Sequence, residues 1–205
     1  MTRLAVVDHG AGNLVSIAQG LRRTGSDVSV VTSPEGLNGA DGVVLPGVGS
    51  TAAVMEGIRA AGFEEALCNL DVPLLGICVG MQVLFDRSEE DDTDCLGLLA
   101  GDVMRLRHAP RLPHIGWNNL ALTAADPLLM GLPADPTVYF VHSFAPVPSD
   151  EDAAIATTEY GTEIVAAVRK GLVAGVQFHP ERSGSNGLKI LANFVGACRE
   201  ASRAA

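Results

Sequence analysis

The alternation of strand and helix patterns in the first 90 residues constrains the fold more than any other feature. Short apolar runs typical of buried strands occur at 4–8, 27–33, 41–47 and 72–78. Helical spacing of apolar residues follows at 14–25 and 50–63, and a further helix is expected over 80–90. Strands that alternate with helices predict a parallel sheet covered by helices on both faces.

The second half has closely spaced strand patterns instead. They lie at 137–144, 153–160, 163–170 and 172–180, with a turn signal, RKGL, between the last two. A final helix is expected over 185–202, with an apolar stripe at Leu188, Leu191, Phe194 and Val195. The segments 88–94 and 108–114 are expected to be exposed loops. We therefore expect one α/β domain over 1–205: a mostly parallel central sheet with an antiparallel strand set added in the second half.

Composition excludes several classes of function. The net charge of −10 argues against nucleic-acid binding, which needs a basic face. No apolar run approaches the length that spans a bilayer, and the N-terminus does not resemble a signal peptide. The four cysteines, without CxxC spacing, are expected to be cytosolic thiols, so we expect a cytoplasmic protein. No phosphate-binding loop or dinucleotide fingerprint occurs, and neither a metal nor a cofactor is expected.

One cysteine lies where a strand is expected to turn into a helix. Gly76, Cys78 and Gly80 form G-x-C-x-G, the cysteine form of a nucleophile elbow. Glycines on both sides leave room for so tight a turn, and a helix N-terminus favours a thiolate. A small buried residue is the alternative at Cys78, and the motif by itself leaves the two about equal. Cys68, Cys95 and Cys198 are expected to be ordinary buried residues.

A thiol nucleophile needs a base, and His179 is the candidate among five histidines. It closes an apolar strand in GVQFHPERS, and Glu181 follows two residues later. Residues two apart in an extended chain share a face, and Pro180 disfavours helix at His179. Glu181 is therefore expected to orient the imidazole ring as the third member of a triad.

The glycine-rich segment LPGVGS is expected at the same sheet edge. Backbone amides near Gly47, Val48 and Gly49, together with the amide of Val79, are candidates for an oxyanion hole. A plain β-turn is the alternative interpretation of this segment.

These motifs resemble those of the class I glutamine amidotransferases, which have a flavodoxin-like three-layer fold. Cys78, His179 and Glu181 match the catalytic triad of that family, and Gln82 in GMQ matches a glutamine-binding position. The resemblance also implies that Ser143 and Phe144, in YFVHSF, contribute to the substrate site. Within the class, the segments DHGAGN, LPHIGWNNL, YFVHSF and GVQFHPERS resemble the glutaminase subunit of imidazole glycerol phosphate synthase.

That resemblance implies a reaction and a partner. The thiolate would attack L-glutamine, and the ammonia would pass to a cyclase subunit with a (β/α)₈ barrel in a heterodimer. There it would help make imidazole glycerol phosphate and aminoimidazole carboxamide ribotide. Residues implied to face the barrel are Asn13, Trp117, Tyr139 and Arg182. Ordinary core packing is an equal alternative for Trp117 and Tyr139.

The sequence departs from that family at three positions. His9 stands where tyrosine is common, Phe144 where HSY is common, and Arg182 where H-P-E-K is common. The changes at His9 and Arg182 are expected to affect only the partner-facing edge. Alternatives are a glutaminase subunit of another synthase (anthranilate, aminodeoxychorismate or pyridoxal phosphate), a γ-glutamyl hydrolase that works alone, and a non-catalytic binding module.

Overall fold

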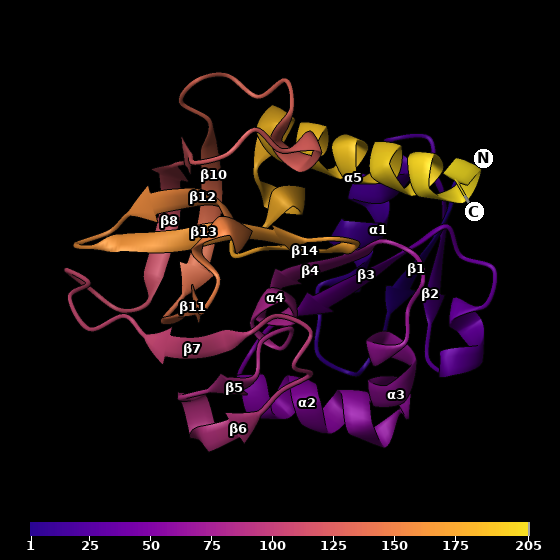
Figure 1. Ribbon diagram of the computed structural model, residues 1–205, viewed down its shortest axis with the longest axis horizontal. Coiled ribbons are helices and arrows are strands. Elements are labelled where there is room, and N and C mark those ends of the chain that lie inside the picture. The colour runs from indigo at the N-terminus through magenta and orange to yellow at the C-terminus, as the bar shows by residue number, and fades with distance from the viewer. Residues whose placement is uncertain (205) are drawn as a thin grey trace.

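A computed structural model describes residues 1–204 and places a large sheet between two layers of helices (Figure 1). The sheet has the order β2-β1-β3-β4-β14-β13-β12-β9. Its strands are β1 (Arg3–Val7), β2 (Asp27–Val31), β3 (Gly42–Gly47), β4 (Leu74–Cys78), β9 (Ala121–Leu122), β12 (Ala154–Glu159), β13 (Glu163–Lys170) and β14 (Val173–Val176). Pairing is parallel from β2 through β14 and antiparallel from β14 to β9. The predicted mostly parallel sheet with an added antiparallel set is confirmed.

Helices cover both faces of the parallel part. Figure 1 shows α1 and α5 on one face and α2 and α3 on the other. The helices are α1 (Leu14–Arg22), α2 (Thr51–Ala60), α3 (Phe63–Cys68), α4 (Val79–Gln82) and α5 (Gly184–Ala204). The buried stripe of α5 contains Ile190, Leu191, Phe194 and Val195, whereas Leu188 is half-buried. The predicted stripe is therefore right except at its first position.

Two smaller sheets lie beside the main sheet. One pairs β8 (His114–Asn119) with β10 (Thr137–His142), and the other has the order β11-β7-β5-β6. The strands of the second are β5 (Arg87–Ser88), β6 (Thr93–Asp94), β7 (Gly101–Arg105) and β11 (Phe144–Pro148). Single 3-10 turns are η1 (Pro34–Leu37), η2 (Glu90–Asp92), η3 (Pro127–Leu129), η4 (Glu151–Ala153) and η5 (Pro180–Arg182). The expected strand 137–144 is thus two strands of different sheets that meet at Ser143.

The helix expected over 80–90 is wrong, because α4 ends at Gln82. The carbonyls of Val83, Leu84 and Phe85 accept hydrogen bonds from the amides of residues 96, 99 and 97. These carbonyls are therefore not available to amides four residues further along a helix. All three side chains are fully buried, so the segment is a non-helical part of the core and not one face of an amphipathic helix.

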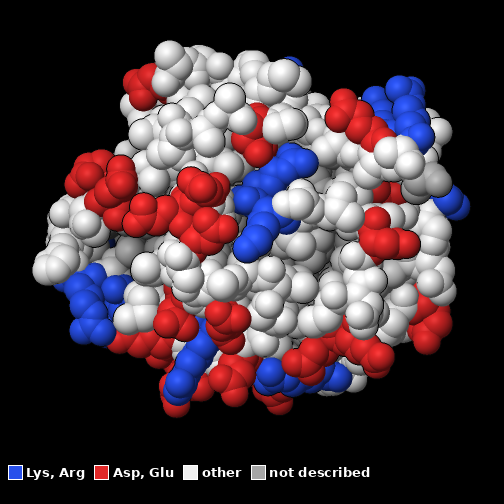
Figure 2. Space-filling model, in the orientation of Figure 1, with Lys and Arg blue, Asp and Glu red and all other residues white. Residues whose placement is uncertain are grey.

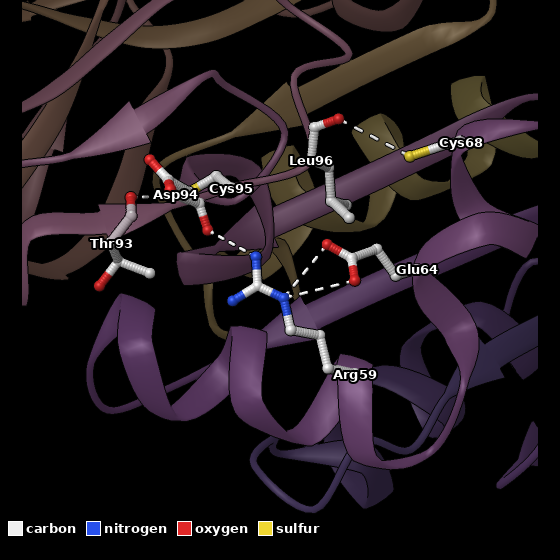
Figure 3. A network of polar contacts seen from close by, with 7 residues as sticks. All are labelled: Arg59, Glu64, Cys68, Thr93, Asp94, Cys95 and Leu96. Atoms are coloured by element: carbon white, nitrogen blue, oxygen red, sulfur yellow. Dashed lines mark hydrogen bonds and ion pairs between the residues drawn. The ribbon is translucent and has the colours of Figure 1, made fainter.

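The three cysteines outside the elbow differ in burial. Cys198 is buried and Cys95 is half-buried, but Cys68 is exposed, which corrects the expectation for that residue. Figure 3 shows Cys68 and Cys95 in a polar network in which Arg59 contacts Glu64 and the Asp94 carbonyl. Burial raises the pKa of all three thiols, to about 11 for Cys95 and about 12 for Cys198. A raised pKa favours the protonated thiol over the nucleophilic thiolate at all three positions.

Acidic side chains outnumber basic ones on the face shown in Figure 2, where a short stripe of basic side chains lies at the centre. This distribution agrees with the negative net charge of the whole chain. In the part of the chain that the structure describes, no helix combines the length and the apolar character that crossing a membrane requires.

Candidate active site

Cys78 ends β4 and begins α4 with a backbone conformation that is unusual for a residue with a side chain. Its φ is 57° and its ψ is −114°. A Cβ on Gly80 would overlap the Leu45 carbonyl, and a Cβ on Gly76 would lie 2.5 Å from the Gly80 carbonyl oxygen. The two glycines therefore let β3, β4 and α4 approach closely enough to hold the strained turn.

The neighbouring strands bring the second half of the motif to the same edge. Gly47 at the end of β3 pairs with Cys78, and Val176 at the end of β14 pairs with Ile77. His179 follows three residues after β14 ends. Because parallel strands share a carboxyl edge, residues about 100 positions apart reach one site.

His179 and Glu181 form a buried pair. His179 Nδ1 lies 3.0 Å from Glu181 Oε1, and the Glu181 side chain has no exposed area. The contact between His179 and Glu181 was predicted, but the backbone conformation that produces it is different. Pro180–Arg182 is a 3-10 turn, and only His179 is extended. The carboxylate is therefore positioned beside His179 Nδ1 by a turn, and not by the alternation of side chains along one strand.

The charge state of His179 follows from its neighbours. Burial by itself would lower its pKa, but interactions with Cys78 and Glu181 outweigh burial and raise the pKa to about 10. At a pKa of about 10 the His179 ring is an imidazolium at neutral pH.

Cys78 and His179 line one cavity of about 230 Å³. Its other lining residues are Val48, Gly49, Val79, Gln82, Glu90, Pro113, Val141, His142, Ser143 and Phe144. The volume lies below the ~300–1,000 Å³ typical of pockets for drug-sized ligands, so the cavity suits a small metabolite. The candidate oxyanion residues Val48, Gly49 and Val79 and the substrate-site candidates Gln82, Ser143 and Phe144 are all among them.

Gly47 is not among the cavity-lining residues. A Cβ there would lie 2.5 Å from the Gly80 amide nitrogen, so this glycine allows β3 to pack against α4. Its neighbour Pro46 accepts a hydrogen bond on its carbonyl from His9 Nε2 at 2.7 Å. His9 is buried and contacts the glycine-rich segment, and the expectation that it affects only a partner-facing edge stays a prediction.

Glu90 and His142, which line the cavity, and Gln177, which contacts Cys78, were not singled out from the sequence. Glu90 lies in the segment expected to be a solvated loop, but its Oε2 accepts hydrogen bonds from Thr51 N and Oγ1 at the start of α2. Gln177 donates to Cys78 Sγ at 3.8 Å, and His142 lines the cavity wall. Gln177 and His142 each interrupt an apolar strand with a polar residue, a signal that could have found them.

The four residues expected to face a partner lie at the surface or near it. Trp117 is 57% exposed and packs edge-on against Tyr139, with ring centroids 5.9 Å apart. The Arg182 guanidinium lies 4.3 Å from the centre of the Tyr139 ring. Asn13 is exposed at the start of α1. Core packing therefore does not explain Trp117.

Among residues 1–204, no group of three or more His, Cys, Asp or Glu side chains is arranged to hold a metal ion. The groups that the cavity offers are the sulfur of Cys78, the His179 imidazolium and backbone amides at the start of α4, which lack helical partners.

Comparisons with known proteins identify the family of the chain. Residues 5–198 match the family model for class I glutamine amidotransferases. The chain is 50% identical over 200 residues to the imidazole glycerol phosphate synthase subunit HisH of Synechococcus sp. (strain JA-3-3Ab), covering 94% of this chain and 93% of that one. It is 45% identical over 195 residues to the HisH subunit of Dehalococcoides mccartyi (strain CBDB1), covering 93% and 95%.

A crystal structure of a glutamine amidotransferase shares the fold. Its TM-score is 0.72 at 23% identity, with 94% of this chain and 98% of that chain covered. The chain therefore belongs to the class I glutamine amidotransferase family and, within it, to the HisH subunits of imidazole glycerol phosphate synthase.

Proposed function

We propose that this chain hydrolyses L-glutamine to glutamate and ammonia with Cys78 as nucleophile. The observation that carries the proposal is the strained elbow of Cys78, which shares a cavity with His179, a ring held by the buried Glu181. The whole chain is then one glutamine amidotransferase domain, which works without a cofactor.

The first half of the reaction forms a thioester. The Cys78 thiolate attacks the side-chain carbonyl carbon of glutamine, and the carbonyl oxygen becomes an oxyanion. Amides of Val48, Gly49 and Val79, which line the cavity, would stabilise that charge. The C–N bond breaks as the His179 imidazolium gives its proton to the departing nitrogen, which leaves as ammonia.

The second half restores the enzyme. Neutral His179 takes a proton from water, and the resulting hydroxide adds to the γ-glutamyl thioester. The C–S bond breaks, glutamate leaves and Cys78 returns as a thiolate beside the imidazolium. Glu181 keeps Nδ1 engaged throughout, so that Nε2 is the nitrogen that exchanges the proton.

We infer that the ammonia is consumed by a cyclase subunit of (β/α)₈ fold, in a heterodimer. The HisH relatives are named as subunits of imidazole glycerol phosphate synthase, which supports this partner. The exposed Trp117 with Tyr139 and Arg182 is the surface proposed to meet it. The products would be imidazole glycerol phosphate and aminoimidazole carboxamide ribotide, in histidine biosynthesis, and a cytoplasmic location stays a prediction.

Replacing the nucleophile tests the mechanism. In the complex with the cyclase subunit, Cys78→Ser should reduce glutamine-dependent synthesis by at least ~10³-fold and leave ammonia-dependent synthesis unchanged, because only the first requires the thiolate. Cys68→Ser, at an exposed thiol, is the matched control and should lose neither activity. Glutamine-dependent turnover that survives in Cys78→Ser would exclude Cys78 as the nucleophile.

Ammonia release with and without the cyclase subunit separates the alternatives. A synthase subunit should be nearly inactive alone and active in the complex. A γ-glutamyl hydrolase that works independently would be equally active in both conditions, and the subunit of another synthase would not form the complex.

A further inference from the structure

Two buried histidines that the mechanism does not use lie in and behind the wall of the proposed glutamine cavity. His114 on β8 and His142 on β10 are directly opposite each other in the two-stranded sheet. They are 2% and 6% exposed, and His114 Nδ1 lies 3.0 Å from His142 Nε2. His142 lines the cavity, whereas His114 lies one layer further from it.

The direction of the hydrogen bonds through this pair is fixed at one end. His142 Nδ1 lies 2.9 Å from the Phe144 carbonyl oxygen, which can only accept, so Nδ1 carries the hydrogen. In a neutral ring His142 Nε2 is then an acceptor, and His114 Nδ1 must donate to it. His114 Nε2 accepts in turn from Asn118 Nδ2 at 3.4 Å. The hydrogen bonds therefore run one way, from β8 to the Phe144 carbonyl.

The surroundings keep both rings neutral. His114 is stacked between Tyr160 and Phe140, with centroid distances of 3.8 and 4.8 Å. Burial lowers the pKa of His114, and burial with the nearby His114 and His179 rings lowers the pKa of His142 to about 4. The one-way arrangement of donors and acceptors therefore persists through the neutral pH range.

The Phe144 carbonyl connects these hydrogen bonds to Gln82, a candidate substrate-site residue. It also accepts a hydrogen bond from Gln82 Nε2 at 2.8 Å, and the second hydrogen of Gln82 Nε2 goes to Gln177 Oε1 at 3.0 Å. Both Gln82 N–H groups are thus engaged inside the protein. The side-chain oxygen of Gln82 is the atom left to accept a hydrogen bond from a substrate in the cavity.

We propose that His114 and His142 are positioning residues that orient the Phe144 carbonyl and, through it, the Gln82 side chain for binding the amino-acid substrate. The proposal rests on the proposed glutaminase function, because it assigns a binding role within that site. Neither histidine touches the reacting atoms, so their loss should weaken substrate binding more than it slows the chemical step.

Substitutions at His114 separate this role from a merely structural one. His114→Phe keeps an aromatic ring between Tyr160 and Phe140 but removes the donor to His142. In the complex, it should raise the KM for glutamine about tenfold, the effect of one lost hydrogen bond, and change kcat less than threefold. His114→Asn places an amide N–H near the position of Nδ1 and should recover part of the KM, although it stacks less well.

The exposed His108 supplies the control, and His108→Phe should leave both constants unchanged. A wild-type KM in His114→Phe would overturn the proposal. It would also be overturned if His114→Asn raised the KM more than His114→Phe does and in proportion to its loss of unfolding free energy. If the wild-type complex itself did not hydrolyse glutamine, the proposed function would fail first, and these constants could not be measured.

Nitrogen-15 NMR of histidine-labelled protein tests the hydrogen-bond order without any activity. Both rings should be neutral and protonated on Nδ1 at pH 7, a tautomer less common than Nε2–H for free histidine. An Nε2–H tautomer or an imidazolium at either position would overturn the proposal, whatever the kinetic result.

Discussion

At the scale of single residues, the site depends on histidines held in opposite charge states a short distance apart. His179 is kept protonated by the sulfur of Cys78 and by Glu181, whereas His142 is kept neutral by burial. In the proposed mechanism, proton transfer to the leaving nitrogen needs a protonated His179, and a fixed hydrogen-bond direction in the cavity wall needs a neutral His142. Both states follow from the groups within contact distance and not from the residue type.

The low pKa of His142 predicts a loss of stability in acid. Its pKa is about 4 in the folded protein, against about 6.5 for an exposed histidine. Between those values the unfolded chain binds one more proton, so this contribution is fully present above pH 6.5 and is lost as the pH falls toward 4. The free energy of unfolding should fall by up to ~1.4 kcal/mol per pH unit in that window from this residue.

Denaturant unfolding at several pH values measures this slope. His142→Phe should unfold with a weaker pH dependence than wild type between pH 6.5 and 4, because the titrating group is gone. Since other groups titrate in both proteins, the difference between the two slopes is the quantity to compare. Identical slopes would show that His142 is not buried in a neutral form.

At the scale of elements, the turn at Cys78 depends on β3, β4 and α4, which approach more closely than side chains at their glycines would allow. Gly80 faces the Leu45 carbonyl, and Gly47 faces the Gly80 amide. Local preference by itself would not place a cysteine at positive φ. The strand pairing on both sides of β4 therefore supplies the constraint that holds the elbow.

Gly80→Ala should consequently destabilise the fold and remove activity. The added methyl group would overlap the Leu45 carbonyl, and relief requires a backbone shift that costs ~1–3 kcal/mol or more. Gly196→Ala is the matched control, because that position lies within α5 with nothing inside 4 Å of the added atom. It should stabilise the protein by ~0.5–1 kcal/mol in thermal unfolding. Equal stability of the two variants would contradict this account of the elbow.

At the scale of the whole molecule, the carboxyl edge of the parallel strands gathers the cavity and the exposed aromatic surface. Tyr139 connects them, because its carbonyl accepts from the His179 amide at 2.9 Å while its ring contacts Trp117 and Arg182. A partner that binds this surface would therefore touch residues next to the base of the proposed triad.

Trp117→Ala should weaken binding of the cyclase subunit by about 30-fold or more, the cost of an interface hot spot of ~2 kcal/mol. The fold should be unaffected, because the side chain is mostly exposed. Titration calorimetry measures the affinity. Leu172→Ala is the control, since Leu172 is 43% exposed but lies before β14, at the opposite edge of the sheet. Unchanged affinity in Trp117→Ala would place the interface elsewhere.

The sequence by itself determined the alternation of strands and helices, the antiparallel addition and the presence of a tight turn at Cys78. These features follow from local spacing, because apolar periodicity reports which face of an element is buried and a glycine pair reports a tight turn. The contact between His179 and Glu181 could also be predicted from their spacing, although the 3-10 turn that joins them could not.

Only the tertiary structure decided which side chains meet across elements. The carbonyls of residues 83–85 pair with a later segment and end α4 early, and His9 contacts Pro46 from the loop after β1. The series of hydrogen bonds from His114 through His142 and the Phe144 carbonyl to Gln82 likewise depends on the register of β8 against β10. Long-range hydrogen bonds and charge states of this kind depend on distances between segments, and no local pattern in the chain encodes those distances.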